Sequence, residues 1–396
     1  MLTVAEARTK ILAAATPAVA NMQVPLQQAH GRILAADVLA PIQVPPCDNS
    51  AMDGYAVRVA DLLAGPLPVA GAIYAGAAPG ELLVGTAQRI FTGAPLPAGA
   101  DAVVIQEDVQ RNGDTIALLD GAKVVAGDNI RRAGEDIRVG EQVLVAGRRL
   151  QAADIGLLAS LGIAAVAVRS PLRVGLLCTG DELLEPGDPP QPGRIYNSNR
   201  YLLVAMLGSL GCEVVDAGIV GDDLAATCTA LQQLAQGVDV LVSTGGVSVG
   251  DADVVKQAVE SLGGLDVWKI AVKPGKPLAF GHVCGKPFFG LPGNPVSAFV
   301  TLLLFVQPFL QRAQGGDVRD PVCVPVKAGF AWPKAGKREE YLRVTLQREG
   351  EALVAIRLPN QGSGVLSSVA RADALLRVPV GTTFVLGDVV ECLLLP

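Results

Sequence analysis

Histidine and cysteine, which often carry zinc, redox and Ser–His chemistry, are scarce in this chain of 396 residues. Only His30 and His282 occur, so multi-histidine metal sites and most Ser–His catalysis are poorly supported. The seven cysteines are scattered and include no C-x-x-C pair. That pattern is typical of small buried residues in a reducing compartment and argues against a disulfide or zinc framework.

Long apolar runs are also missing, although half of the residues are hydrophobic. No uninterrupted run approaches the roughly 20 residues of a membrane-spanning helix. The longest apolar stretch, 298–309, contains Pro308 and is interpreted as a buried helix. The first residues lack the ordered regions of a secretory signal, and Thr3 and Glu6 form a capping-box pattern ahead of an alanine-rich helix. We therefore expect a cytoplasmic protein with no membrane partner.

Positive charge is limited, and its distribution is uneven. The net charge of −6 argues against nucleic acid as a bulk partner. The chain has ten lysines, yet Lys269, Lys273 and Lys276 fall within eight residues. Residues i and i+4 of a strand share a face, so Lys269 and Lys273 are expected to point the same way. Exposed strand edges commonly carry lysine, but the neighbouring residues 270–272 are apolar, which favours an anion clamp.

The chain is too long for one hydrophobic core, and its composition divides it into four zones. We interpret them as a discontinuous helical linking domain (1–43 and 141–170), an inserted small β-domain (44–140), a doubly wound α/β domain (171–316) and a C-terminal β-domain (317–396). We expect residues 1–43 to be mostly helical. We also expect the helix at 153–162 to pack with the N-terminal helix, and short strands at 102–106 and 123–125.

Strands and helices alternate from residue 171, which predicts a parallel sheet with helices on both faces. The expected strands are 172–180, 212–220, 238–246, 266–272, 278–283 and 287–291. The expected helices are 198–210, 223–235, 251–263 and 295–313. Ligands bind such sheets at the carboxyl ends of the strands.

Acidic residues follow three of these strands, namely the pairs Asp181/Glu182, Asp222/Asp223 and Asp251/Asp253. Carboxylates from three strand ends can share a Mg²⁺ ion, which prefers oxygen ligands. The alternative is that Asp222 and Asp251 are ordinary helix N-caps. Taken singly each is better explained as a cap, whereas the set favours a magnesium site.

A glycine-rich loop at 244–251 ends where a helix is expected to begin. Gly245, Gly246 and Gly250 let the backbone approach a ligand, and a helix N-terminus offers free N–H groups to an anion. The neighbouring hydroxyls favour phosphate binding; they belong to Ser243, Thr244 and Ser248. The loop matches neither a Walker A nor a G-x-G-x-x-G pattern, and a tight turn without a ligand is the alternative.

A second turn, GLPGNP (290–295), leads into the last helix of this region. Pro292 and Pro295 stiffen it, and Asn294 is expected to cap the helix. By itself this is an ordinary helix start.

Polar loops also occur at 48–58, 91–104 and 131–137. Their polar residues include Asp48, Asn49, Ser50, Asp53, Thr92, Arg131, Arg132, Glu135 and Asp136. Each loop alone is typical of a turn whose polar side chains form hydrogen bonds within the turn itself. Because they lie far along the chain from the α/β region, we expect them to meet it across a domain cleft or from another subunit.

Taken together, these stretches resemble the molybdopterin molybdotransferase family, the molybdenum insertases, which includes the gephyrin E domain. The resemblance covers nearly the whole chain in order. Its motifs are DNSAMDGYAVR (48–58), IFTGAPLPAGADAVV (90–104), RRAGEDI (131–137), ASLGIA (159–164), TGDEL (179–183), IYNSN (195–199), STGGVSVGDAD (243–253), KPGKPLAFG (273–281), GLPGNPVSA (290–298) and NQGSGVLSS (360–368). Two departures are slight: Asn197 stands where several relatives have Asp, and Asp251 replaces a common Glu.

The resemblance implies an elongated four-domain homodimer that inserts molybdenum from molybdate into adenylylated molybdopterin, releases AMP and requires Mg²⁺. It places the site between the α/β domain of one subunit and the β-domain of the other. The implied partner-side residues are Asp53, Thr92 and Asp136. The implied α/β-side residues are Asp181, Glu182, Asp222, Asp253, Lys269, Lys273 and Lys276, with Glu182, Asp222 and Asp253 holding the metal. Arg343 and Ser363 match positions near the anion, and a molybdopterin adenylyltransferase is the implied substrate donor.

Two other functions fit parts of the pattern. A non-catalytic pterin-binding scaffold is one, but every acidic and basic motif position is retained. The other is a Mg²⁺-dependent phosphotransferase or adenylyltransferase, which the same loops suggest but which would not require two β-domains.

Overall fold

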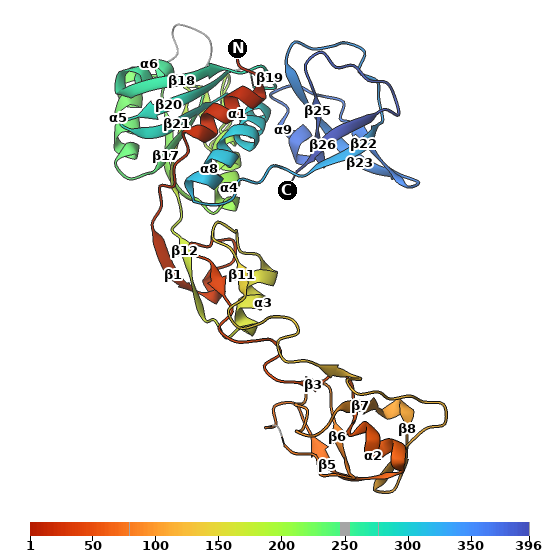
Figure 1. Ribbon diagram of the computed structural model, residues 1–396. Coiled ribbons are helices and arrows are strands. Elements are labelled where there is room, and N and C mark those ends of the chain that lie inside the picture. The colour runs from red at the N-terminus through yellow and green to blue at the C-terminus, as the bar shows by residue number, and fades with distance from the viewer. Residues whose placement is uncertain (79, 246–253, 276, 396) are drawn as a thin grey trace.

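The computed structural model describes residues 1–78, 80–245, 254–275 and 277–395, and the chain forms an elongated molecule. Figure 1 shows the α/β domain and the C-terminal β-domain side by side at one end. A slender linking region runs from them to the inserted β-domain at the other end. The two polar halves identified in the sequence therefore lie at opposite ends of one chain.

The inserted β-domain is built on a six-stranded sheet in the order β7-β4-β6-β5-β9-β8. Its elements are β3 (Asn49–Ser50), β4 (Gly54–Val57), α2 (Val59–Ala64), β5 (Leu67–Ile73), β6 (Ala87–Ile90), β7 (Ala102–Ile105), β8 (Val109–Asn112), β9 (Thr115–Leu118) and β10 (Ile130–Arg131). The strand expected at 123–125 is wrong. The Asp128 carboxylate accepts a bond from the Val125 N–H, which holds this segment in a turn.

The linking region is mainly short strands, so the expectation that residues 1–43 are mostly helical is also wrong. β1 (Asn21–Pro25) pairs antiparallel with β12 (Ala165–Arg169), and β2 (Val38–Leu39) pairs with β11 (Gln142–Leu144). α3 (Ala152–Ser160) packs on these strands through Leu158, which is fully buried. The alternating valines of β12, Val166 and Val168, suit a pleated ribbon better than a helix.

The N-terminal helix packs on the α/β domain and not on α3. α1 (Val4–Ala13) has the predicted capping box between Thr3 and Glu6. Its apolar face, Ala7 and Ile11, is fully buried in the same core as α8. The Leu2 N–H also donates to the Lys269 carbonyl at 3.2 Å. The helix has a better apolar partner there than the short α3 could offer, which explains the failed prediction.

The α/β domain confirms the doubly wound prediction. Its sheet has the order β16-β13-β17-β21-β20-β18, with the first four strands parallel and the last two antiparallel. Its elements are β13 (Arg173–Thr179), α4 (Ser198–Ser209), β16 (Glu213–Val220), α5 (Leu224–Ala235), β17 (Val240–Thr244), α6 (Val254–Leu262), β18 (Gly263–Lys269), β20 (Pro277–Val283), β21 (Lys286–Leu291), α7 (Pro295–Thr301), the π-helical segment η3 (Leu302–Val306) and α8 (Gln307–Ala313). One core joins the sheet to α1, α4, α7 and α8, and a second joins it to α5 and α6.

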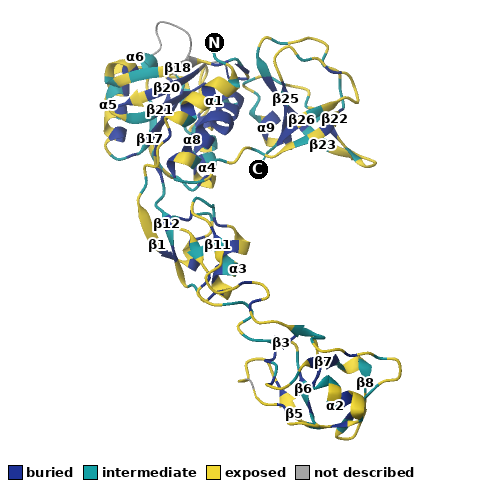
Figure 2. Ribbon diagram, in the orientation of Figure 1, coloured by how far each residue is buried: buried dark blue, intermediate teal, exposed yellow. Residues whose placement is uncertain are grey.

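The helix formed by α7, η3 and α8 is the longest apolar helix of the domain. Residues 295–313 are long and apolar enough to cross a membrane by length and composition alone. However, 83% of the tested window is buried inside the protein, and Figure 2 shows α8 mostly in the buried colour. It is therefore the core helix that the apolar stretch predicted.

The C-terminal β-domain is joined to the α/β domain through a shared strand. Its sheet has the order β19-β23-β24-β22-β26-β25, and β19 (Val272–Lys273) comes from the α/β sequence. The other elements are β22 (Cys323–Ala328), β23 (Glu339–Glu349), β24 (Ala352–Arg357), α9 (Leu366–Ala370), β25 (Ala374–Val378) and β26 (Val389–Leu394). The chain leaves the first sheet after Lys269, so Lys269 and Lys273 do not share one strand as predicted.

The expectation that the cysteines are buried holds for Cys178 and Cys392 alone, and Cys47, Cys212 and Cys228 are only half-buried. Cys284 and Cys323 are exposed. Cys284 lies in the turn between β20 and β21 with a φ of 48°. A hairpin turn needs this conformation at the surface, so burial there is not possible.

The stability of the linking region depends on one buried carboxylate. Asp154, 4% exposed, accepts bonds from the Gln151 N–H at 2.8 Å and from the Arg148 guanidinium at 3.0 and 2.8 Å. Burial raises the pKa of Asp154, but these bonds outweigh it and leave that pKa below its usual value. The stabilisation is complete above the unfolded-state pKa and is lost as the pH falls through the folded-state pKa.

Replacement of Asp154 by Asn tests this buried pair. Asp154→Asn should lower the free energy of unfolding of the linking region by about 2 kcal/mol at neutral pH, because Arg148 loses its charged partner. The difference from wild type should disappear in strong acid. Thermal unfolding as a function of pH measures it, with exposed Asp120→Asn as the control. A difference that persisted unchanged in strong acid would contradict this role.

Candidate active site

The carboxyl edge of the parallel sheet carries the first half of the site. From β13 the chain passes to β16 on one side and then to β17 on the other. This reversal is a topological switch point, where open α/β sheets bind ligands. Among the described residues, Glu182 after β13, Gly245 after β17 and Gly293 after β21 line one small pocket here.

Asn199 ties two of these loops together. It lies at the start of α4, and its Nδ2 donates to Thr244 Oγ1 at 2.8 Å and to the Gly293 carbonyl at 2.7 Å. Thr244 Oγ1 in turn donates to the buried Pro292 carbonyl at 3.3 Å. The amide thus fixes the end of β17 against the turn after β21, and half-buried Pro295 lines the same small pocket.

Asn197 precedes Asn199 and caps α4, its Oδ1 accepting a bond from the Arg200 N–H at 3.2 Å. An Asp would accept the same bond, which explains why the departure from several relatives is tolerated.

Two buried hydroxyls lie at the ends of β13 and β17. Thr179 Oγ1 and Ser243 Oγ have no hydrogen-bond partner among the described residues. Gly245 follows directly, and a Cβ there would collide with the Thr179 carbonyl. Its φ of 92° also favours glycine. Buried donors without partners are rare and mark sites that a ligand can satisfy.

Several predicted residues lie outside the described residues. They are Gly246, Ser248, Gly250, Asp251, Asp253 and Lys276. Their predicted roles therefore stay predictions.

The structure brings together two of the predicted carboxylates. The Asp222 N–H donates to Asp181 Oδ1 at 3.1 Å, and the Asp181 N–H approaches Asp222 Oδ2 at 3.4 Å. Asp223, not Asp222, caps α5 through the Ala226 N–H at 2.7 Å. The simple N-cap explanation is therefore wrong for Asp222, whose carboxylate faces the β13 loop.

Glu182 follows Asp181 and is exposed. Within the described residues, no group of three His, Cys, Asp or Glu side chains forms a ready-made metal cluster. Asp181, Glu182 and Asp222 nevertheless place oxygen donors at one sheet edge, which fits a partly hydrated Mg²⁺.

Two lysines of the 269–276 cluster, Lys269 and Lys273, are described and have different surroundings. Lys269 is exposed at the end of β18. Lys273 Nζ forms an ion pair with Glu340 at 2.9 Å, and the Lys273 side chain is still half exposed. One face of that ammonium is therefore open to a ligand.

Arg343 is the largest fully buried side chain of the described residues, at 1% exposure. Its guanidinium donates to Ser368 Oγ, the Tyr341 carbonyl and the Gly362 carbonyl at 3.1–3.3 Å. No carboxylate in the described part of the chain pairs with it. A buried cation without a counter-charge is costly, and burial lowers the pKa of Arg343.

Ser363 joins the C-terminal β-domain to the switch-point loops. Its carbonyl accepts a bond from the Val296 N–H, in the first turn of α7, at 3.0 Å. Asn294 precedes that helix but makes no capping bond with its side chain to the described residues. The predicted Asn294 cap is therefore wrong, and the loop carrying Ser363 covers this helix end instead.

The inserted β-domain carries the second half of the site. Asp53 Oδ1 accepts bonds from the Thr92 N–H and hydroxyl, both at 2.8 Å. These bonds, with the nearby Arg89 charge, lower the pKa of Asp53. The Arg89 guanidinium donates to the Gly54 carbonyl at 3.1 Å and lies 4.9 Å from the centre of the Phe91 ring.

The loop with Asp136 approaches the same region. Asp48 accepts bonds from the Arg132 guanidinium at 2.7 Å and the Ala133 N–H at 2.8 Å, and Asn49 pairs with Arg131 in a short ribbon. Asp136 is exposed. The three polar loops thus gather on one module, which lies far from the α/β domain of its own chain (Figure 1).

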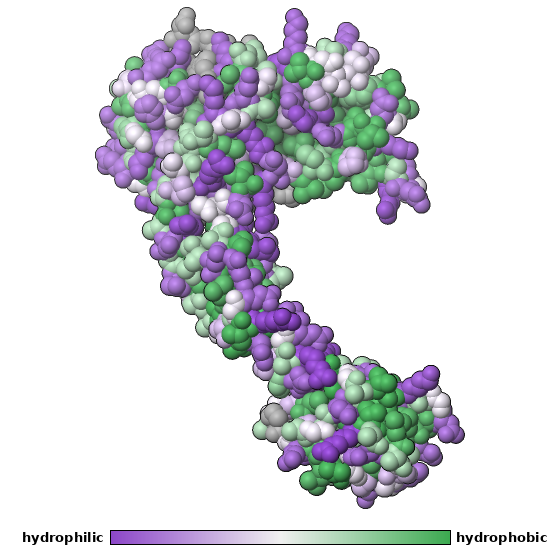
Figure 3. Space-filling model, in the orientation of Figure 1, coloured by the Kyte–Doolittle hydropathy of each residue, from purple (hydrophilic) through white to green (hydrophobic). Residues whose placement is uncertain are grey.

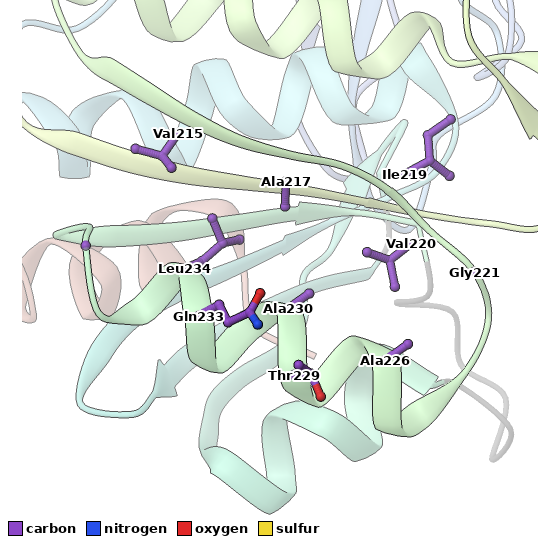
Figure 4. A pocket seen from close by; sticks show the side chains of 11 residues that line it. Val215, Ala217, Ile219, Val220, Gly221, Ala226, Thr229, Ala230, Gln233 and Leu234 are labelled. Atoms are coloured by element: carbon purple, nitrogen blue, oxygen red, sulfur yellow. The ribbon is translucent and has the colours of Figure 1, made fainter.

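A broader pocket beside the sheet edge has the wrong chemistry for an anion. It lies between β16 and α5 and has a volume of about 760 Å³ (Figure 4). Residues such as Val215, Ala217 and Leu234 line it, and none of its lining residues is charged. The smaller pocket at the sheet edge, lined by Thr179, Asn199 and Gly245, is the better candidate for an anion site despite its size.

Reasoning from the sequence missed several residues that the structure places at the site. Asn199 was available as the last residue of IYNSN, but its bonds depend on loops 45 and 94 residues away. Glu340 and Gln361 were not recognised, although Glu340 pairs with Lys273 and Gln361 Oε1 accepts the Arg343 N–H at 2.9 Å.

Comparisons with known proteins agree with this architecture. Residues 2–162 match the family model "MoeA N-terminal region (domain I and II)", 175–312 match "Probable molybdopterin binding domain" and 325–395 match "MoeA C-terminal region (domain IV)". The chain is 46% identical to a molybdopterin molybdenumtransferase of Haemophilus influenzae over 80% of this chain and 78% of that one. It is 40% identical to molybdopterin molybdenumtransferase 2 of Mycobacterium tuberculosis over 90% of both chains.

A solved structure agrees as well. The molybdopterin biosynthesis moeA protein of Pyrococcus horikoshii superposes with a TM-score of 0.85 at 31% identity, covering all of both chains. The chain therefore belongs to the MoeA family of molybdopterin molybdenumtransferases, which are transferases of molybdenum cofactor biosynthesis.

Proposed function

We propose that this enzyme inserts molybdenum from molybdate into adenylylated molybdopterin and releases AMP, with Mg²⁺ as cofactor and a homodimer as the working form. The observation that carries the proposal is the buried Arg343 charge, which has no carboxylate partner among the described residues and lies beside Lys273. Such a charge is offset best by an anion that binds there.

The substrates themselves set the electrostatic problem. Molybdate is a dianion and the adenylylated pterin carries a pyrophosphate, so their approach is opposed by Coulomb repulsion. Lys273 and Arg343, with Lys276 and Ser363, would hold molybdate beside the two sulfurs of the pterin. Thr179, Ser243 and the backbone at Gly245 would bind the pyrophosphate end, and Pro292 and Pro295 would shape that pocket.

Mg²⁺ would be held by Glu182, Asp222 and Asp253, directly or through water, and when bound it would polarise the phosphoanhydride. Asp181 keeps Asp222 in place through the paired N–H contacts of the two loops. Lys269 would neutralise charge at the outer rim. The chain thus acts by positioning and electrostatics, and no protein nucleophile is required.

The homodimer follows from the distance between the two halves of the site. Asp53, Thr92 and Asp136 belong to the inserted β-domain, which lies at the far end of the molecule from the C-terminal β-domain that carries Arg343 (Figure 1). A second subunit would bring its β-domain to the α/β domain of the first. Exposed apolar residues along the linking region, Leu39, Ile42 and Val139, are 44–64% exposed and would be covered in such a dimer. Figure 3 shows apolar surface on the linking region and the inserted β-domain.

Asp53 would then orient the nucleotide or an attacking water from the partner side. Its Oδ1 is occupied by Thr92, so Oδ2 remains to accept a bond from substrate. The lowered pKa keeps Asp53 ionised across the neutral range. Asp136 would support the same group. A molybdopterin adenylyltransferase is the proposed source of the adenylylated substrate, and the cytoplasm the proposed location.

Glu182→Ala tests the metal role. The variant should release AMP from adenylylated molybdopterin and molybdate about 100-fold more slowly than wild type, because one Mg²⁺ ligand is lost. Exposed Glu260→Ala on α6 is the matched control. AMP release is followed by chromatography over a Mg²⁺ titration. Wild-type turnover by Glu182→Ala would refute the metal role.

Mixed dimers test the shared site. Asp53→Asn and Asp222→Asn should each be inactive as pure proteins. Random exchange of subunits gives half heterodimers with one intact site each, so about a quarter of wild-type activity should return. AMP release before and after mixing measures this. If mixing restores nothing although co-purification of differently tagged subunits shows that they have exchanged, the site is not shared between subunits.

A further inference from the structure

The edge strand of the α/β sheet, β16, contains a bulge. Leu176 of β13 pairs with Asp216, but Cys178 pairs with Ile219, so two steps along β13 match three along β16. Gly218 lies within these three steps and has a φ of 74°, a left-handed conformation that favours glycine. Bulges are rare between parallel strands and are over-represented next to active sites, where they redirect side chains.

The bulge exchanges the two faces of the strand. Successive side chains of a regular strand point to opposite faces, so residues five apart do not share a core. Val215 and Val220 are five apart, yet both pack on the core formed with α5 and α6. Without the bulge, the side chains that follow it would face the opposite way. The conformation of Gly218 therefore sets the direction in which the chain approaches Asp222, two residues beyond Val220.

Asp216 holds the bulge in place. Its Oδ1 accepts a bond from the Gly218 N–H at 2.8 Å, and its Oδ2 accepts one from Arg200 Nε at 2.6 Å. One carboxylate thus fixes the left-handed turn of β16 and ties that turn to α4. A Cβ at position 218 would meet no described atom within 4 Å beyond its chain neighbours, so glycine is needed there for its backbone conformation and not for space.

Arg200 also binds the loop that carries the other acidic residues. Its Nη1 donates to Glu185 Oε1 at 2.7 Å. Glu185 directly follows the short strand β14 (Leu183–Leu184), which begins after Glu182. A planar guanidinium holds two carboxylates at a fixed separation, which a single ammonium does not. Arg200 therefore links the segment that contains Glu182 to the segment that ends at Asp222.

The two linked segments meet directly beyond the bulge. The Gly180 N–H donates to the Val220 carbonyl at 3.3 Å, and the Asp222 N–H donates to Asp181 Oδ1 at 3.1 Å. Both bonds join the chain after the bulge to the loop after β13. The acidic residues of the two loops are thus brought to one place by backbone geometry.

We propose that Arg200, Asp216 and Gly218 are positioning residues for the carboxylates that the proposed function assigns to Mg²⁺. They act through the backbone, by setting the separation and the relative direction of Glu182 and Asp222. This role rests on the proposed function, because it concerns the groups that would hold the metal. Groups that orient metal ligands typically change metal affinity about 10- to 100-fold when they are lost.

Hydrogen exchange of the intact protein, without metal or substrate, measures the positioning. Arg200→Gln should raise the amide exchange rates of segments 180–185 and 216–223 about tenfold, because the link between them is lost. Gly218→Ala should raise exchange in 216–223, because alanine is strained in the left-handed conformation. Arg173→Gln is the matched control, since it removes an ion pair that joins the same two strands at their other end, and it should change neither segment.

The magnesium requirement separates positioning from stability. In Arg200→Gln the Mg²⁺ concentration for half-maximal AMP release should rise about tenfold, while the rate at saturating Mg²⁺ stays within about twofold of wild type. A loss of folded protein would instead lower that rate and leave the half-maximal concentration unchanged. Arg200→Lys should recover part of the shift, because it keeps the charge but not the two-pronged geometry.

Three results would overturn the role of Arg200. They are unchanged exchange in both segments of Arg200→Gln, a rise in exchange spread evenly over the α/β domain, and an unchanged Mg²⁺ requirement. A wild-type protein that released no AMP would instead refute the proposed reaction, and the exchange rates would still decide whether Arg200 holds the two acidic segments together.

Discussion

The uncompensated charge of Arg343 is the constraint on which the site depends. Its guanidinium is removed from water and donates only to neutral groups, Ser368 and two backbone carbonyls. Such a charge destabilises a folded chain unless something offsets it. Under the proposed function the offset would be a bound anion, and the free enzyme would store part of the binding energy as electrostatic cost. The shared strand β19, which brings Lys273 to the C-terminal β-domain, makes this arrangement possible.

The proposed site, divided between the ends of an elongated chain, would also demand a stiff connection. The joint between the linking region and the α/β domain is polar and buried. Arg149 donates to the Gly31 carbonyl at 2.6 Å and to the Leu210 carbonyl at 2.9 Å, and Gln314 donates to the same Leu210 carbonyl at 3.2 Å. Bonds from a planar guanidinium fix orientation as well as contact. The linking region is therefore held in a defined orientation on the α/β domain, which the proposed two-subunit site would require.

The sequence predicted the parts of this molecule that depend on local pattern. The strand–helix alternation predicted the α/β domain, and α5, expected at 223–235, spans Leu224–Ala235. Predictions from local pattern failed where contacts between residues distant in sequence determine the structure. The apolar face of α1 did not reveal that α8 would cover it, and the Lys269–Lys273 spacing did not reveal that the chain changes sheets between them. The acidic and basic site residues were predicted because a charged residue at the end of an expected strand can be recognised from a short segment of sequence. Asn199 and Gln361 were missed, because the role of a neutral amide depends on the group that it contacts in the folded chain.

The two halves of the proposed site stabilise their charged groups in different ways, which explains why each can fold without its ligand. In the β-domain, Asp53 is satisfied by Thr92 and balanced by Arg89, so its charge costs little. At the sheet edge, Asp181 and Asp222 are held by each other's backbone N–H groups. Arg343, by contrast, is a buried charge with no carboxylate partner among the described residues. The uncompensated charge thus lies where the proposed function would place the oxyanion. If an oxyanion binds there, its binding would also stabilise the C-terminal β-domain, because Arg343 belongs to that domain.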